Sequence, residues 1–223
     1  MLLPVPHHLM SLSYKPNICD SDLKATDHTH SKFCKSYRST GVGGCLCGRH
    51  TLVGKLGDLQ KGERYVLHTH GQRRNLIAPS HSYANMDFIV LSTLLGTFML
   101  ALTISYDICC QWSRNLAKRM PQFPSFMQID KDRLRAAKFV LPQFHIYNHG
   151  IKCILNYSLS FLRWSAASDL EDPERWWAHI NPVSMSTREM SEGSRHDTLD
   201  DHARSWNWRK ITGFGMCTIS LAS

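Results

Sequence analysis

A tract without any charged side chain, Phe88 to Tyr106, limits most strongly what this chain can fold into. The tract approaches the roughly 20 apolar residues that a helix needs to span a bilayer, so a single-pass membrane protein is one alternative. Serine, threonine and glycine dilute its apolar character, however. From Met99 to Asp107 larger apolar residues alternate with small or hydroxyl-bearing ones, as in a strand with one buried face. We therefore expect a helix followed by a core strand.

The part of the chain that follows this tract alternates between helix and strand patterns. Apolar residues recur at near-helical spacing until prolines interrupt them, and a short apolar run then suggests a strand. Two further segments have helical spacing, and the second has acidic residues in its first turn. The predicted segments are a helix at 108–120, a strand at 139–146, a helix at 153–161 and a helix at 173–180. This alternation predicts an α/β domain.

Composition divides the chain into four parts. Residues 1–64 are rich in Cys, His, Gly and Ser and contain few runs long enough for a core element, so they read as a small loop-rich module. Residues 65–82 are basic, His-rich and aperiodic, like an insertion. Residues 83–215 contain the α/β pattern, and residues 216–223 form an unassigned tail. The full 223 residues, 43% of them hydrophobic, suffice for one core.

The charge balance favours an anionic partner. Lys and Arg number 26 against 18 Asp and Glu, which gives a formal net charge of +8 and points to a polyanion such as DNA. Near the C-terminus cationic and aromatic residues interleave, a mixture that could hold phosphates and stack on bases. The alternative is a packed edge. This set comprises Arg188, Arg195, His196, Arg204, Trp206, Trp208, Arg209 and Lys210.

The 8 cysteines and 13 histidines suggest metal ligands. The N-terminus lacks the basic and long apolar regions of a secretory signal, so we expect a reducing compartment, where clustered cysteines bind metal more often than they form disulfides. Cys45, Cys47 and His50 fall within one glycine-rich turn. Zinc needs about four such ligands, and the fourth could come from Cys19, Cys34, His28 or His30. Isolated thiols and a surface histidine are the alternative.

Acidic residues at two element boundaries are candidates for a divalent-metal site. Asp107 follows the predicted strand, and two-metal phosphoryl transfer needs carboxylates that converge from different elements. Its simpler role is that of a helix cap. Asp169 to Glu174 opens a predicted helix with an acidic cluster, which the helix dipole alone would favour. A third metal ligand could also lie there.

Several strings occur in an order that resembles one protein family. They are Asp58–Tyr65, Ala84–Phe88, Ser105–Trp112, Phe144–Ile146 with His149, Glu171–Arg175, Trp177–Val183 and Thr187–Lys210. With them the chain resembles the Kyakuja/Dileera/Zisupton (KDZ) transposases of fungi, including their cysteine cluster of the CxC type. The resemblance runs from Cys19 to Gly215.

This resemblance implies a partial RNase H-like core of the integrase type, with a small zinc-binding module at the N-terminus. Acidic residues would bind Mg or Mn and direct cleavage and transfer of DNA strands. Asp107 would be the second acidic ligand and Glu171 the third, with Glu174 the less favoured choice. The zinc ligands would include Cys19, Cys47 and His50, while Asp22 stands near the place of an expected His.

The resemblance also implies a nuclear protein whose partner is DNA at transposon ends. Self-association fits that role, whereas a small-molecule substrate or a membrane does not.

The chain departs from the family pattern in several places. The family's first catalytic Asp lies in an Asp-x-Asn-Phe strand upstream of the cysteine insert, and this sequence lacks that string. Leu170 replaces a Gly in the acidic signature. Tyr65 to Ser82 interrupts a family string that its removal would restore, so we interpret it as a retained intron. The resulting hypothesis is a fragment of a DDE-type DNA transposase, inactive alone. The alternatives are a non-catalytic, zinc-stabilised nucleic-acid-binding remnant and, less favoured, a small single-pass membrane protein.

Overall fold

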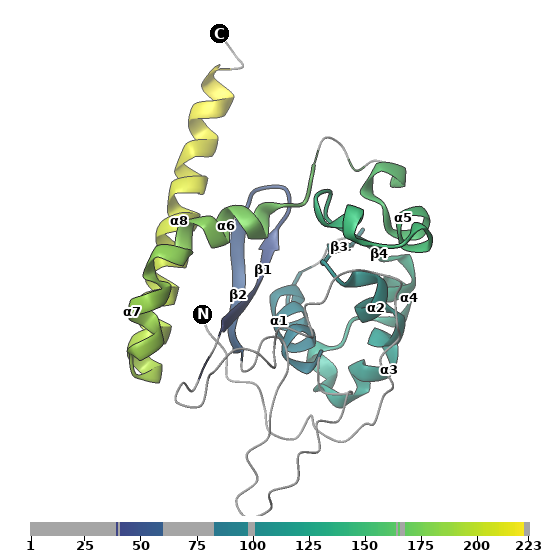
Figure 1. The fold of residues 1–223 in the computed structure, drawn as a ribbon, viewed down its shortest axis with the longest axis horizontal. Helices are drawn as coiled ribbons and strands as arrows, with labels where there is room; N and C mark the ends of the chain where they lie inside the picture. The colour runs from purple at the N-terminus through teal and green to yellow at the C-terminus, as the bar shows by residue number, and fades with distance from the viewer. Residues whose placement is uncertain are drawn as a thin grey trace, which may run out of the picture.

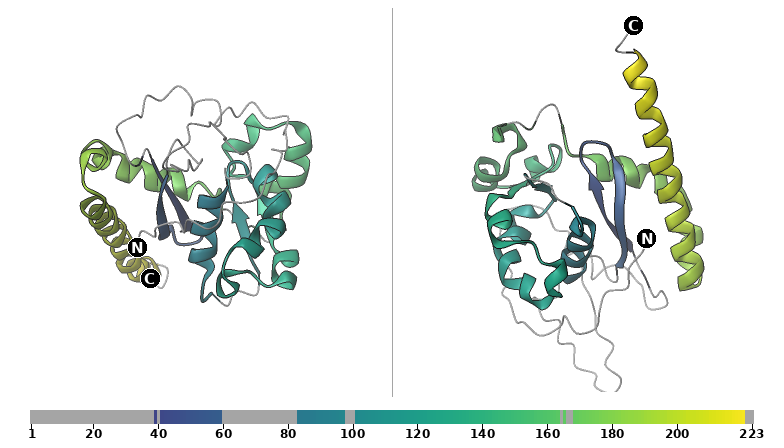
Figure 2. Two further views of the ribbon diagram at one scale, coloured as in Figure 1. Left: turned by 90° about the horizontal axis from the view of Figure 1, so that it is seen from below. Right: turned by 180° about the vertical axis from the view of Figure 1, so that it is seen from behind.

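The computed structural model describes residues 39, 41–59, 83–97, 101–163, 165 and 168–220, with side chains up to residue 214. The predicted ligand positions Cys19, Asp22, His28, His30 and Cys34 lie outside these ranges, as does the whole segment 65–82. A β-hairpin stands in the middle of the fold, between α1 on one side and the C-terminal helices α6 and α8 on the other (Figure 1). The helical turns between residues 109 and 161 lie beyond α1 on the side away from the hairpin, whereas α7 (Ser184–Glu189) lies beside α8 (Figures 1 and 2).

The hairpin consists of β1 (Gly41–Cys47) and β2 (Leu52–Leu59), paired antiparallel with a register shift between Gly44 and Leu46. A loop-rich segment was predicted here, and for these residues that prediction is wrong. The strands were not recognised because they contain glycines at positions where α1 (Ala84–Leu94) packs closely. A Cβ added at Gly57 would lie 2.9 Å from the Ile89 side chain of α1. The strands therefore lack side chains where the helix approaches closely, and this hides the usual strand pattern.

The tract from Phe88 to Tyr106 forms a helix and then a strand, as predicted. The helix α1 ends at Leu94, and β3 (Thr103–Ser105) is shorter than the alternation from Met99 to Asp107 suggested. β3 pairs in parallel with β4 (Lys138–Val140), so Ile104 lies opposite Phe139. Pro142 limits the second strand, because proline cannot donate a ladder hydrogen bond.

Short helical turns form the crossover between β3 and β4. They are α2 (Cys109–Trp112), η2 (Ser113–Asn115), α3 (Leu116–Arg119), η3 (Met120–Gln122), η4 (Ser125–Met127) and α4 (Lys131–Ala136). A parallel pair needs such a connection, and helices usually supply it. The predicted helix at 108–120 is thus present as a series of shorter pieces.

The elements that follow β4 are helical. Its elements are η5 (His145–Asn148), α5 (Ile151–Tyr157), η6 (Leu159–Phe161), α6 (Asp172–Ile180), η7 (Asn181–Val183), α7 (Ser184–Glu189) and α8 (Glu192–Ser220). The helix α8 runs along the hairpin and extends past it (Figures 1 and 2). Its Asn207 bonds both backbone groups of Val53, accepting from the N–H at 2.7 Å and donating to the C=O at 2.9 Å. The side-chain amide thus covers part of the edge of β2.

Two hydrophobic clusters hold these elements. The larger joins α1 to the crossover turns and α5, with Trp112, Leu116 and Leu141 among its most buried side chains. The smaller joins the hairpin to α6 and α8 through Leu56, Trp176 and their neighbours. No helix in the described part of the chain has both the length and the apolar character needed to cross a membrane.

A buried ion pair fixes α1 against the crossover. Asp87 on α1 is 1% exposed and accepts hydrogen bonds from Arg119 Nη2 at 2.9 Å and Trp112 Nε1 at 2.7 Å. Arg119 Nη2 also donates to the Trp112 carbonyl. A charge buried this deeply costs several kcal/mol unless it is paired, so each partner depends on the other.

Substitution of Asp87 by Ala should lower the free energy of unfolding by about 3–5 kcal/mol, because it leaves the Arg119 guanidinium buried without its counter-ion. The paired change Asp87→Leu with Arg119→Met should cost far less, since it removes both charges. Urea unfolding of the purified variants measures both. Asp132→Ala removes an 87% exposed carboxylate and serves as a control that leaves stability nearly unchanged. A loss below about 1 kcal/mol for Asp87→Ala would contradict the account.

Candidate functional site

Asp107 lies at the end of the parallel strand pair. The sheet hydrogen bonding continues to Tyr106, whose N–H donates to the Val140 carbonyl at 3.3 Å, and α2 begins two residues after Asp107. The carboxyl end of a parallel strand is where open α/β sheets bind ligands. The Asp107 side chain is 45% exposed, so one side of it faces solvent.

The acidic start of α6 brings two glutamates to the same place. Glu171 is the N-cap residue of α6 and Glu174 lies in its first turn. Leu170, just before them, has a φ of 58°, in the left-handed region that favours glycine. The backbone thus turns sharply into α6 at Leu170.

His145 joins these carboxylates. Its Nε2 lies 3.6 Å from Asp107 Oδ2 and 3.9 Å from Glu174 Oε1. Asp107, His145 and Glu174 can offer one ligand atom each, all within 4.8 Å of one another. No role was predicted for His145 from the sequence. The signal was present as Phe144–Ile146 in the family strings, but its convergence with Asp107 depends on the tertiary fold.

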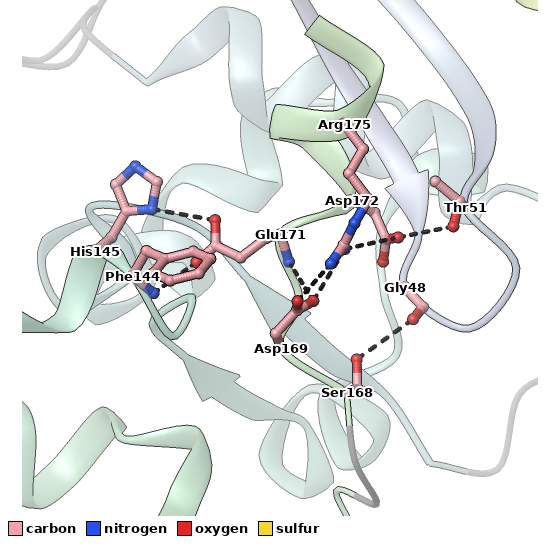
Figure 3. Close-up of polar contacts among 9 residues, drawn as sticks. All are labelled: Gly48, Thr51, Phe144, His145, Ser168, Asp169, Glu171, Asp172 and Arg175. Atoms are coloured by element: carbon pink, nitrogen blue, oxygen red, sulfur yellow. Dashed lines mark hydrogen bonds and ion pairs between the residues drawn. The ribbon is translucent and has the colours of Figure 1, made fainter. Parts of the chain in front are cut away.

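Glu171 holds the segment that carries His145. It is 3% exposed, its Oε1 accepts a hydrogen bond from the Phe144 N–H at 2.7 Å, and its Oε2 lies 3.5 Å from His145 Nδ1 (Figure 3). Of the two glutamates, Glu174 therefore lies in the cluster with Asp107, while Glu171 supports His145 from the opposite side of the ring.

The electrostatics of Asp107 reflect this crowding. Burial raises the pKa of its carboxyl, the neighbouring His145 lowers that pKa, and the charges of Glu174 and Glu171 raise it. Crowded carboxylates repel one another and gain from a cation between them. Two carboxylates and an imidazole are donors that Mn²⁺ accepts, whereas Mg²⁺ prefers oxygen ligands alone. The residues present therefore fit a divalent cation.

An ion pair and a hydrogen bond fix the start of α6. Arg175 Nη1 donates to Asp169 Oδ1 at 3.0 Å, and this hydrogen bond lowers the pKa of Asp169 to about 2. Asp172 Oδ1 accepts from the Thr51 hydroxyl at 2.7 Å, which ties α6 to the turn of the hairpin (Figure 3). The glutamates thus sit on an element anchored at both sides.

The predicted zinc ligands are brought together only in part. Cys47 Sγ lies 3.6 Å from His50 Nδ1, and both residues are exposed at the hairpin turn. Burial raises the pKa of the Cys45 thiol to about 11, so this thiol stays protonated and is a poor ligand. A second group of possible ligands, Cys110, His149 and Cys153, is buried elsewhere and was not predicted from the sequence.

Much of the C-terminal basic and aromatic set is packed. Arg195 is 8% exposed and donates from Nε to Asp58 Oδ1 at 2.9 Å, and His196 Nε2 lies 3.1 Å from Asp58 Oδ2. Trp206 donates from Nε1 to the Thr51 carbonyl at 2.7 Å. Trp208, in contrast, is 68% exposed. The packed-edge alternative therefore describes Arg195, His196 and Trp206, and contact with DNA would rest on the exposed members of the set.

Glycine should suit position 170 better than alanine. Both variants remove the leucine side chain, but only alanine keeps the strain of a Cβ at a φ of 58°. We expect Leu170→Gly to be more stable than Leu170→Ala by about 1 kcal/mol in urea unfolding, because of this strain. Equal stability of the two variants, or greater stability of the alanine variant, would show that the turn is not strained.

The Asp169–Arg175 ion pair should make stability depend on pH in the acid range. Because the pKa of Asp169 is lowered on folding to about 2, its contribution is complete above the unfolded pKa and disappears as pH falls toward 2. Asp169→Asn should cost about 1 kcal/mol near pH 7, after allowance for solvent screening of a half-exposed Arg175. The difference should shrink below pH 4. Urea unfolding at several pH values measures it, with exposed Asp201→Asn as the control; a cost that does not change with pH would contradict this pairing.

One comparison with known proteins, a scan against family models, finds a match over most of the chain. The model of the Kyakuja-Dileera-Zisupton transposase family matches residues 7–69 and 75–207, which contain Asp107, His145, Glu171 and Glu174. The break between the two matched stretches falls inside the segment 65–82. No curated protein and no solved structure shows significant similarity to the chain. Because the family model covers most of its length, the chain belongs to the Kyakuja-Dileera-Zisupton (KDZ) transposase family.

Proposed function

We propose that this chain is part of a DDE-type DNA transposase core, and that Asp107, Glu174 and His145 bind its divalent cation. The observation that carries the proposal is the convergence of ligand atoms from Asp107, His145 and Glu174 within 4.8 Å. These residues come from the end of β3, from η5 and from the first turn of α6. Such convergence from separate elements is what metal-dependent phosphoryl transfer requires.

The order of elements supports a partial RNase H-like core. An antiparallel hairpin is followed by α1, then by a parallel strand pair with Asp107 at the end of its first strand, and then by a helix that carries the glutamates. The two sheets have two strands each in the described part of the chain. A fuller RNase H-like sheet would have more strands than these, so we propose a fragment of that fold.

Each residue of the cluster has a distinct part in this proposal. Asp107 and Glu174 are the oxygen donors that face solvent, with side chains 45% and 57% exposed. Glu171 orients His145, or completes the ligand set if its contact with the Phe144 N–H is released. The chemistry that a bound divalent cation supplies is activation of the attacking oxygen and stabilisation of charge on the phosphate.

The cluster offers donors for one ion, whereas strand cleavage by the two-metal route needs donors for two. We therefore propose that the chain alone binds a cation and DNA without cleaving strands. Its partner is DNA at transposon ends and its site of action is the nucleus. The net charge of +8 supports an anionic partner.

A second function has its own supporting observation. The Cys47–His50 pair at the hairpin turn has the right ligand types for zinc, and Trp208 is exposed on the neighbouring C-terminal helix. A zinc-stabilised, non-catalytic nucleic-acid-binding remnant would bind DNA through such features and would not need Asp107 or Glu174. Dependence on these two carboxylates therefore separates the two functions.

Mn²⁺ titration of the purified full chain, followed by calorimetry, tests the proposal. We expect one bound ion, with affinity weakened at least about tenfold by Asp107→Asn and by Glu174→Gln, since each removes a charged ligand. Glu189→Gln makes the same charge change on exposed α7 and should leave affinity unchanged. Wild-type affinity in both site variants would refute the metal site and leave the non-catalytic remnant as the better function.

A further inference from the structure

The described part of the chain contains a second group of possible metal ligands that shares no residue with the carboxylate cluster. We propose that Cys110, His149 and Cys153 bind a structural zinc ion. One ligand atom from each lies within 4.8 Å of the other two. This site is separate from the Cys47–His50 pair at the hairpin turn, and it does not depend on the proposed transposase function.

The distances suit zinc. Cys110 Sγ lies 3.6 Å from His149 Nδ1. With Zn–S near 2.3 Å and Zn–N near 2.0–2.1 Å, tetrahedral geometry puts a sulfur and a nitrogen ligand about 3.6 Å apart. The same distance also suits a hydrogen bond between a thiol and an imidazole. Such a bond would need one cysteine, however, and here a second one converges on the same histidine.

The chemistry of the pocket favours an ion as well. Cys110 is 0% exposed, and His149 and Cys153 are each 5% exposed. The imidazole is therefore removed from water. Burying a polar ring is costly, and a metal bond at Nδ1 would offset part of that cost. Thiolate and imidazole are the ligands that zinc prefers in proteins.

The location gives the ion a structural role. Cys110 belongs to α2, directly after Asp107, whereas His149 follows η5 and Cys153 belongs to α5. A zinc ion here would link the segment that carries Asp107 to the segment that carries His145. No fourth His, Cys, Asp or Glu joins this group within the described residues, so water is the expected fourth ligand.

Zinc content tests the proposal in a background where the other candidate site is removed by Cys47→Ser and His50→Ala. The full chain in this background, purified without chelators, should contain about one zinc per molecule by elemental analysis. Cys110→Ser and Cys153→Ser should each abolish that zinc. Cys109→Ser is the matched control, because Cys109 is equally buried and adjacent but lies outside the group, so zinc should remain.

A zinc-free background protein would overturn the proposal, and so would zinc that survives both serine substitutions. If Cys109→Ser also loses zinc, the serine variants are misfolded and do not report on the ligands. Cobalt binding to the background protein, which keeps all three ligands, then tests the proposal. Co²⁺ added to the zinc-stripped background protein should give thiolate-to-cobalt charge-transfer absorption that saturates at one equivalent. Absence of that absorption would show that Cys110 and Cys153 interact with His149 by hydrogen bonding alone.

Discussion

The buried contact among Asp87, Arg119 and Trp112 is the interaction on which the larger hydrophobic cluster depends. It links α1 to the crossover turns, and all three residues are more than 90% buried. The same helix approaches the hairpin through Ile89, which contacts the glycine side of the strands. A single helix therefore sets the position of the hairpin on one face and of the crossover on the other. Because α2 belongs to that crossover, the position of Asp107 follows from it.

The candidate site lies where the two hydrophobic clusters meet. Asp107 and His145 belong to segments that pack into the larger cluster, whereas Glu174 is on α6, which packs into the smaller one. The hydrogen bond from the Phe144 N–H to Glu171 connects the two parts. The bond from Thr51 to Asp172 fixes α6 to the hairpin within the smaller part. The carboxylates can therefore meet only when the α6 side and the α2 side are both folded. Loss of structure on either side should therefore separate the carboxylates.

The local features of this structure were predictable from the sequence. Periodicity and helix-capping signals within a few residues predict three of them. These are the helix and strand of the uncharged tract, the place of Asp107 just after that strand, and the start of α6. The hairpin was missed because Gly43 and Gly57 replace the apolar residues that would mark a strand, and their absence of side chains is explained only by the approach of Ile89. Likewise, the parts that His145 and Cys110 play arise from contacts between distant segments, which no local pattern encodes.

The most direct test of this account is the position of a bound ion. Crystals of the full chain soaked in Mn²⁺ should give an anomalous scattering peak between Asp107 Oδ2, Glu174 Oε1 and His145 Nε2, at about 2.2 Å from the nearest oxygen ligands. A single peak there would support a cation site assembled from β3, η5 and α6. A well-ordered site with no peak, in which His145 remains between the carboxylates, would contradict it.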